Sequence, residues 1–380
     1  MPQIINIGLP APDATELTEL QRAYTQATRE AEHLIYGHGD FNESDSSLLA
    51  SWKSVRYWDS RRLLALDDDA DPLAPQPHQV LGLASVQSPL KENRELGYIW
   101  LWVTPEARGR GVGRALAAQV RRELADSGRT TVQVWRTGPI VPGDAPGAIR
   151  SETGFGAVDG GAPEIRWLTS LGFRFEQCER VSTLTIPGEG SGREDWRAAV
   201  GRMGEEARAR ADGYRIVRWQ GRTPERYLED FARLRRRMSV DIPSAGLTSE
   251  EQDVTPERVT YADDLAEARG MQRIVVAAEH ESGALVAYTE LQWPEPGWPG
   301  IWQEDTFVHG EHRGHRLGMW IKAEMLLWLP EVNPAAERIH TWNADENGYM
   351  LSINEALGFE PAAYESAWEL RGIGAGSDPE

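Results

Sequence analysis

The chain has 380 residues, 26% of them charged, and carries a formal net charge of −19. At roughly 100–200 residues per domain this length predicts two domains, and no apolar run reaches the about 18 residues that a membrane-spanning helix needs. The negative charge disfavours nucleic acid and anionic membranes as partners and suits a cationic small molecule. The N-terminus lacks the pattern of a signal peptide, so we expect a cytoplasmic protein.

The first half of the chain predicts strands that lead into a glycine-rich loop and a helix. Its expected strands are rich in aliphatic and aromatic residues and lie at 61–66, 80–86, 97–103 and 130–135. After the loop at Arg108–Gly113, the residues Leu116, Val120 and Leu124 recur at helical spacing. A further helix ends in Leu-Gly-Phe at 171–173. The pattern is typical of an α/β domain.

The second half repeats this order. The segments VTPEARGRGVG, which begins at Val103, and VHGEHRGHRLG, which begins at Val308, superpose without a gap. Each follows a β-rich run and precedes a helical pattern, and each half then has a strand and a helix that ends in Leu-Gly-Phe. We therefore infer that a whole domain is duplicated. The expected parts are an N-terminal domain at 1–186, a linker with a helix at 187–212, a C-terminal domain at 213–372 and a tail at 373–380.

The two loops have the composition of an anion-binding site. Glycines permit positive φ and close approach of the backbone, and the following helix offers unpaired N–H groups and the positive end of its dipole. The expected ligand is a phosphate or pyrophosphate, and two matched copies disfavour a merely structural turn. The expected binding positions are Val103, Arg108, Gly109, Arg110, Gly111, Val112, Gly113 and Arg114 in the first copy, and Val308, Arg313, Gly314, His315, Arg316, Leu317 and Gly318 in the second.

Three histidines in the second loop raise the question of a metal site. His309, His312 and His315 recur at a spacing of three residues. They flank Arg313 and Gly314 in a loop that turns into a helix, so a common ligand face is not expected. We predict no metal site here, and we expect His315 to lie beside the diphosphate.

The loop pattern Arg-x-x-Gly-x-Gly resembles the diphosphate-binding motif of the GCN5-related N-acetyltransferases (GNAT). The first copy matches the motif at Arg108, Gly111 and Gly113, whereas the second has Arg316 at the middle glycine. The resemblance implies an α/β (α+β) protein of two tandem GNAT domains, distantly like mycothiol synthase-like enzymes. Each domain would have a mixed, mostly antiparallel central sheet flanked by helices. It also implies acetyl-CoA or another acyl-CoA as co-substrate, with no metal.

The resemblance further implies where the chemistry takes place. In this family the strand before the loop bulges, the residue two before the valine offers its N–H to the thioester oxygen, and residues four or six before it often act as general base. In the second copy these positions hold Thr306, Glu304 and Trp302. In the first copy they hold Leu101, Ile99 and Gly97, so Glu304 is the expected base.

Three asparagines of the second copy complete the expected site. Asn354 stands where the family has a tyrosine general acid, and Leu168 stands there in the first copy. Family members commonly use asparagine near Asn343 and Asn347 to hold the pantetheine or the acceptor. A helix cap is the competing interpretation for Asn347.

The implied function is transfer of an acyl group, most simply acetyl, from CoA to the amine of a small-molecule acceptor. The amine would attack directly in a ternary complex, with the second copy catalytic. Two alternatives stay open: the chemistry takes place in the first copy, which has the complete loop, or the chain is a CoA-binding regulatory or scaffold protein with a degenerate catalytic site. The acceptor and the oligomeric state stay open as well.

Overall fold

The computed structural model describes residues 2–373, which form two compact units. Unit 1 comprises the residues up to Cys178, the segment Ser244–Ser249 and the residues from Tyr364 onward. Unit 2 comprises Glu179–Pro243 and Glu250–Ala363. Of the expected tail, residues 374–380 lie outside the described part of the chain. Among the described residues, no helix combines the length and the apolar character needed to cross a membrane.

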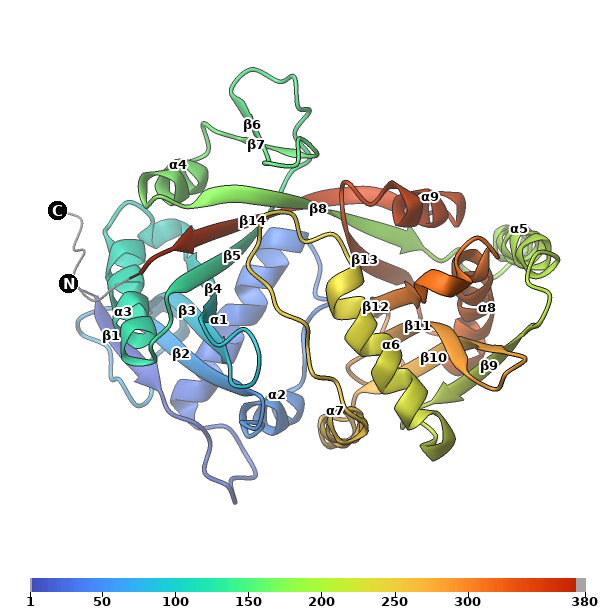
Figure 1. The fold of residues 1–380 in the computed structure, drawn as a ribbon. Helices are drawn as coiled ribbons and strands as arrows, with labels where there is room; N and C mark the ends of the chain where they lie inside the picture. The colour runs from blue at the N-terminus through green and yellow to red at the C-terminus, as the bar shows by residue number, and fades with distance from the viewer. Residues whose placement is uncertain (1, 374–380) are drawn as a thin grey trace. The chain divides into compact units, whose positions relative to one another are not determined.

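Unit 1 contains a mixed sheet with the strand order β1-β2-β3-β4-β5-β14, in which β4 and β5 run parallel (Figure 1). The elements of the N-terminal half are β1 (Gln3–Ile7), α1 (Glu19–Tyr36), α2 (Asp45–Trp52), β2 (Trp58–Leu66), η1 (Pro77–Gln79), β3 (Val80–Pro89), β4 (Leu96–Val103), η2 (Pro105–Ala107), α3 (Val112–Asp126), β5 (Thr131–Gly138), β6 (Ala148–Arg150), β7 (Ala157–Asp159), α4 (Pro163–Ser170) and β8 (Arg174–Thr185). The segment from Gly138 to Pro163 contains the hairpin β6–β7.

Helices cover both faces of this sheet because successive residues of a strand point to opposite sides. In β2, Leu64 and Leu66 pack with α1 and α2, whereas Leu63 and Ala65 pack with α3. The fully buried Leu116 of α3 belongs to the second of these cores. The loop that precedes α3 is therefore held between a buried strand and a buried helix.

Unit 2 contains a sheet with the order β8-β13-β12-β11-β10-β9. The elements of the C-terminal half are α5 (Ser191–Arg208), β9 (Tyr214–Gln220), η3 (Glu225–Tyr227), α6 (Leu228–Asp241), α7 (Pro256–Ala268), β10 (Gln272–His280), β11 (Leu285–Trp293), β12 (Gly300–Val308), η4 (Gly310–His312), α8 (Leu317–Val332), β13 (Arg338–Ala344), α9 (Gly348–Ala356) and β14 (Glu360–Arg371). Ile274 and Val276 pack with α5 and α8, and Val275 and Ala277 pack with α6 and α7 on the other face.

The last strand of each half completes the sheet of the other unit. Residues Glu179–Thr185 of β8 pair with β13 in unit 2, and residues Tyr364–Arg371 of β14 pair with β5 in unit 1. The structural units therefore differ from the expected bounds 1–186 and 213–372. Both strands are 12 residues long and follow a Leu-Gly-Phe helix end, and these sequence features do not distinguish which sheet each strand completes.

The segment expected as a linker at 187–212 belongs to the core of unit 2. Its helix α5 buries Val200 and Ala207 against α8, and Gly204 lies so close to Ala323 that a Cβ there would come within 3.3 Å of it. This helix therefore stabilises unit 2 and is more than a connection between domains.

Candidate functional site

The loop Arg108–Gly113 of unit 1 is folded as an anion-binding turn. The single 3-10 turn η2 precedes it, and the Arg108 side chain donates from Nε to the Val103 carbonyl oxygen at 3.3 Å. Gly109 and Gly111 have φ values of +75° and +84°, a region that other residues rarely occupy. Because α3 begins at Val112, its first N–H groups have no partner within the helix and are available to an anion.

A cavity of about 990 Å³ in unit 1 begins at this loop. Of the expected binding residues, it is lined by Val103, Arg108, Gly109, Gly111, Val112 and Gly113. Arg110 and Arg114 are exposed beside the loop. The structure thus brings most of the first predicted binding set onto one cavity wall.

The cavity continues between β4 and β5, which diverge along their length. The two strands pair in parallel only from Leu96–Ile99 with Thr131–Val134. Beyond that point Leu101 of β4 and Arg136 of β5 both line the cavity. An extended ligand arm can enter such a gap and pair with strand backbone, as the sequence resemblance implies. The pairing of β3 with β4 is regular from Gly82 to Gln87, so the bulge expected in this strand is absent from the described register.

At the β5 end of the cavity, four polar side chains form what we call the carboxylate cluster: Glu32, Tyr36, Thr137 and Glu365. The Thr137 hydroxyl donates to Glu365 Oε1 at 3.1 Å, and the Tyr36 hydroxyl lies 3.1 Å from Thr137 Oγ1. Glu365 lies directly opposite Thr137 in the β14–β5 pair. A continuous hydrogen-bonded chain therefore connects helix α1 to the C-terminal strand of the protein.

Burial makes the groups of the carboxylate cluster more basic. Loss of solvation and the nearby Glu43 raise the pKa of Glu32 to about 7. Burial also raises the pKa of Glu365, which the hydrogen bond from Thr137 partly offsets. The pKa of Tyr36 is raised to about 12, first by burial and then by the negative charge of Glu365. Carboxylates with raised pKa values beside a cavity are suited to accept a proton near neutral pH.

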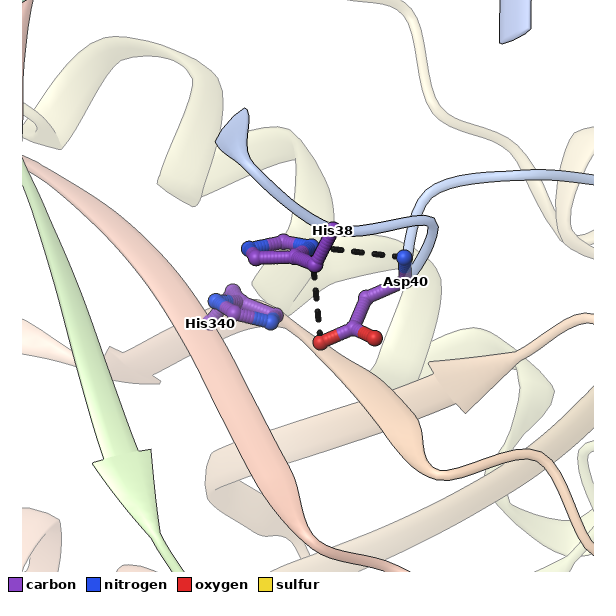
Figure 2. A group of neighbouring side chains, drawn as sticks. All are labelled: His38, Asp40 and His340. Atoms are coloured by element: carbon purple, nitrogen blue, oxygen red, sulfur yellow. Dashed lines mark hydrogen bonds and ion pairs between the residues drawn. The ribbon is translucent and has the colours of Figure 1, made fainter. Parts of the chain in front are cut away.

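The end of α1 is held in place by aromatic and polar contacts. The ring of Tyr36 stacks on His38 at 6.1 Å and meets the edge of Phe41 at 4.6 Å. The backbone N–H of Asp40 donates to His38 Nδ1 at 3.3 Å, and the Asp40 carboxylate lies 3.6 Å from the same nitrogen (Figure 2). These contacts fix the orientation of the Tyr36 hydroxyl toward Thr137.

Sequence reasoning missed the carboxylate cluster. Glu32 and Tyr36 lie on helix α1, far in sequence from either glycine-rich loop. The sequence of this helix indicates an amphipathic helix and nothing about a site. Glu365 lies in the second half of the sequence, and its place in unit 1 follows from the exchanged strand β14. No sequence signal marks that exchange.

The loop of unit 2 has the same backbone fold. Arg313 donates from Nε to the Val308 carbonyl oxygen at 3.2 Å, as Arg108 does to Val103. Gly314 has a φ of +88°, and Arg316 adopts a left-handed φ of +57° where unit 1 has Gly111. A residue with a side chain thus occupies the turn at a cost of about 1–2 kcal/mol.

The remaining positions of this second loop differ in exposure. Leu317 and Gly318 are buried at the start of α8, whereas His315 is exposed. The side chain of Arg313 also pairs with Asp241 of α6 at 3.2 Å. The loop is therefore structurally complete, with its arginine already engaged by a carboxylate of the same unit.

The strand before this loop bulges at the expected position. Thr289 pairs with Thr306 and Leu291 with Gln303, so both Glu304 and Asp305 lie opposite a single residue of β11. The Glu304 side chain reaches the protein surface, but neighbouring protein atoms remove part of the solvation of its carboxylate. This loss of solvation, followed by the negative charges of Glu290 and Asp305, raises the pKa of Glu304 to about 7. A basic carboxylate at this place is compatible with the predicted role of Glu304.

The bulge changes which side chains share a face. The Thr306 hydroxyl lies 2.8 Å from the hydroxyl of Thr289, to which Gln303 also donates. Asp305 instead accepts from the Tyr288 hydroxyl, which packs in the core of α6 and α7. In a regular strand Glu304 and Thr306 would share a face, but the extra residue breaks that alternation.

A buried lysine lies under the bulge. Lys322 is 2% exposed and donates to Gln303 Oε1 at 3.0 Å. Its ammonium group lies 5.2 Å from the ring of Phe359, and burial lowers its pKa to about 7. Gln303 in turn donates to the carbonyl oxygen of Glu290 at 2.8 Å. The lysine therefore fixes the glutamine that organises the bulge.

This lysine is expected to make the stability of the protein increase with pH between about 7 and 10.5, its lowered and ordinary pKa values. In that range the unfolded chain binds a proton that the folded chain lacks, so the free energy of unfolding rises by up to about 1.4 kcal/mol per pH unit. Replacing Lys322 with methionine should remove this increment, as measured by urea unfolding at several pH values. The exposed Lys91→Met is the control, and an unchanged slope in Lys322→Met would contradict the expectation.

Of the three asparagines, two lie together. Asn354 is 1% exposed and donates from its side-chain amide to Asn343 Oδ1 at 2.7 Å, while its own side-chain oxygen Oδ1 has no hydrogen-bond partner among residues 2–373. Asn347 caps α9 by accepting from the N–H of Met350 at 3.3 Å. The capping interpretation of Asn347 thus agrees with its contacts. Asn343 and Asn354 leave one buried acceptor that a ligand could use.

Comparison with known proteins shows that this chain is similar to acetyltransferases in sequence and in structure. Residues 17–139 match the family described as "Acetyltransferase (GNAT) family". No curated protein matches the chain in sequence. Among solved structures, a tandem GNAT protein from the clavulanic acid biosynthesis pathway has a TM-score of 0.66 at 20% identity, and the match covers 99% of this chain and 100% of that one. A GCN5-related N-acetyltransferase from Sphaerobacter thermophilus has a TM-score of 0.53 at 15% identity, with 99% and 98% covered.

The similarity in sequence covers the first loop, and the similarity in structure covers nearly the whole chain. The matched family segment contains Glu32, Tyr36 and the complete loop Arg108–Gly113 of unit 1. The similarity in structure covers both halves, including the degenerate loop at Arg316. The chain therefore has the fold of a tandem GNAT protein, and its residues 17–139 match the model of the acetyltransferase (GNAT) family.

Proposed function

We propose that the protein is an acyl-CoA-dependent N-acyltransferase whose chemistry takes place in unit 1. The observation that carries this proposal is the cavity of about 990 Å³, which joins the loop Arg108–Gly113 to the carboxylate cluster. A diphosphate at the loop and a thioester between β4 and β5 would leave the acyl carbon close to the cluster. Acetyl-CoA is the simplest co-substrate of this class.

The residues of the cluster have the properties that the reaction requires. The amine nitrogen forms a bond to the thioester carbon, the carbon–sulfur bond breaks, and CoA leaves as a thiolate. The attacking amine must lose a proton, and we assign Glu365 as its acceptor because burial raises the basicity of this carboxylate. Thr137 and Tyr36 hold Glu365 in place through the hydrogen-bonded chain.

The acceptor of this reaction is proposed to be a small cationic amine. Glu32 and Glu365 place two carboxylates on the cavity wall, and the rings of Tyr98, Trp100 and Trp135 line it as well. Negative charge and aromatic faces both attract an ammonium group. A second amine on the same molecule would let one carboxylate bind the acceptor while the other accepts the proton.

Unit 2 offers a second candidate site. Its support is the bulge at Glu304, whose raised pKa of about 7 suits a general base, and the N–H of Thr306 beside it. The side chain of Arg316 in the loop weighs against a diphosphate there. We therefore rank unit 2 below unit 1, with Asn343 and Asn354 as its ligand-facing polar groups.

The test of the proposal combines binding and turnover. Calorimetry is expected to detect binding of acetyl-CoA to one site. An assay for the free thiol of CoA should detect faster turnover with small diamines than with amino acids or alcohols. Binding without thiol release for any amine would favour a CoA-binding regulatory or scaffold protein. Absence of binding would contradict both readings.

A further inference from the structure

Four histidines gather around Tyr214 where the loop of unit 2 begins, and we call them the imidazole cluster: His280, His309, His312 and His315. The ring of Tyr214 lies 5.2 Å from His280, 5.7 Å from His312 and 5.3 Å from His315. The histidines come from the end of β10 and from the segment between β12 and α8. The proposed acyltransfer does not use them.

The local fold brings His309 and His312 onto one side of the loop. His309 immediately precedes the 3-10 turn η4 and His312 is its last residue, and the N–H of His312 donates to the His309 carbonyl oxygen at 2.9 Å. Residues three apart in such a turn lie one above the other, which sequence reasoning based on a loop did not consider. The ligand atoms of His309, Glu311 and His312 all lie within 4.8 Å of one another.

Each of two imidazoles has one nitrogen occupied and one left over. The Tyr214 hydroxyl lies 2.9 Å from His312 Nδ1, which leaves Nε2 for another ligand. His280 Nδ1 lies 3.0 Å from the Ser282 hydroxyl, and the rings of His280 and His312 are 5.2 Å apart. Metal-binding histidines are typically oriented by an oxygen on their second nitrogen.

We propose that His309, Glu311 and His312 bind a divalent first-row transition-metal ion in unit 2, with His280 as a further nitrogen donor. Two or three imidazole nitrogens and one carboxylate are a ligand set that Zn²⁺ accepts, whereas Mg²⁺ and Ca²⁺ prefer oxygen. The ion would fasten the turn before α8 to the end of β10. The prediction of no metal in this loop is thereby revised.

The aligned loop of unit 1 supplies an internal comparison. Thr104 and Ala107 stand there at the positions of His309 and His312, and η2 has the same backbone turn as η4. The shared turn thus does not require histidine. The histidines of unit 2 are an addition to a fold that forms without them.

The experiment is a titration of the full chain, freed of metal by a chelator, with ZnCl2 in a calorimeter. We expect saturable binding that the double variant His309→Gln/His312→Gln abolishes. Tyr214→Phe removes the hydroxyl that orients His312 and should weaken binding by about 10–100-fold. Co²⁺ in place of Zn²⁺ should give a visible absorption spectrum of four-coordinate nitrogen and oxygen ligation.

The exposed His78→Gln provides the control and should bind Zn²⁺ as the unaltered chain does. An unchanged circular-dichroism spectrum and urea-unfolding midpoint would show that each variant is folded. Zn²⁺ affinity that stays the same in the double variant would overturn the proposal, as would absence of Zn²⁺ binding to the unaltered chain. Neither result would bear on the proposed acyltransferase, because the metal site does not enter its mechanism.

Discussion

Replacing Gly111 with glutamine is expected to weaken acetyl-CoA binding by at least about 100-fold, or roughly 2.8 kcal/mol. Around Gly111 a Cβ atom would meet no protein atom within 4 Å, so a side chain there would extend into open space beside the loop. In the proposed complex this space holds the diphosphate. The loss corresponds to one or two charge-assisted hydrogen bonds to the phosphate oxygens, each about 1.5–3 kcal/mol. Calorimetry with acetyl-CoA measures it.

The second loop shows that this substitution is compatible with folding. Arg316 keeps the equivalent position left-handed, at a φ of +57°, with a side chain longer than that of glutamine. Arg316→Gln is the matched control, because it places the same glutamine in unit 2 and should leave binding in unit 1 unchanged. If Gly111→Gln bound acetyl-CoA normally and Arg316→Gln did not, the cofactor would have to be assigned to unit 2.

Replacing Glu365 with glutamine is expected to lower turnover by about 10²–10⁴-fold and to leave acetyl-CoA affinity nearly unchanged. Glutamine can still accept the hydrogen bond from Thr137, so the change removes the basicity of the group more than its place in the cavity. A higher pH should partly rescue the variant, because the free amine then loses its proton to solvent. In the unaltered protein, turnover should fall as the pH drops below the raised pKa of Glu365, since the carboxylate becomes protonated. Steady-state rates across pH test both statements.

Glu304→Gln is the matched substitution in unit 2. It changes a carboxylate whose pKa is also raised, to about 7, and which precedes the other loop. If the chemistry takes place in unit 1, this variant should keep its turnover. Loss of turnover in Glu304→Gln with full activity in Glu365→Gln would place the reaction in unit 2 and contradict the proposed catalysis in unit 1.

The repeated loop could be predicted from sequence because its information is local. Glycine at positive φ and an arginine five residues after a valine both follow from nearest-neighbour geometry, and the structure repeats them at Arg108 and Arg313. The flanking strands and helices follow from their apolar periodicity in the same way.

The carboxylate cluster could not be predicted because it depends on which sheet the last strand joins. Glu365 meets Thr137 only through the pairing of β14 with β5, which connects residues 228 positions apart in the sequence. The imidazole cluster depends on a different detail, the 3-10 turn that aligns His309 with His312. The carboxylate cluster depends on strand pairing and the imidazole cluster on the type of turn, and neither can be derived from composition and spacing.

The exchange of the terminal strands has a consequence for the synthesis of the protein. The sheet of unit 1 gains its β14 residues, Tyr364–Arg371, only after the whole second half has been translated. At about 5–20 residues per second, the N-terminal half waits roughly 10–40 s for that strand. Throughout this time β5 has an unpaired edge and the site lacks Glu365. Unit 1 therefore acquires its complete sheet last although it is made first, and a nascent or truncated chain should be catalytically silent.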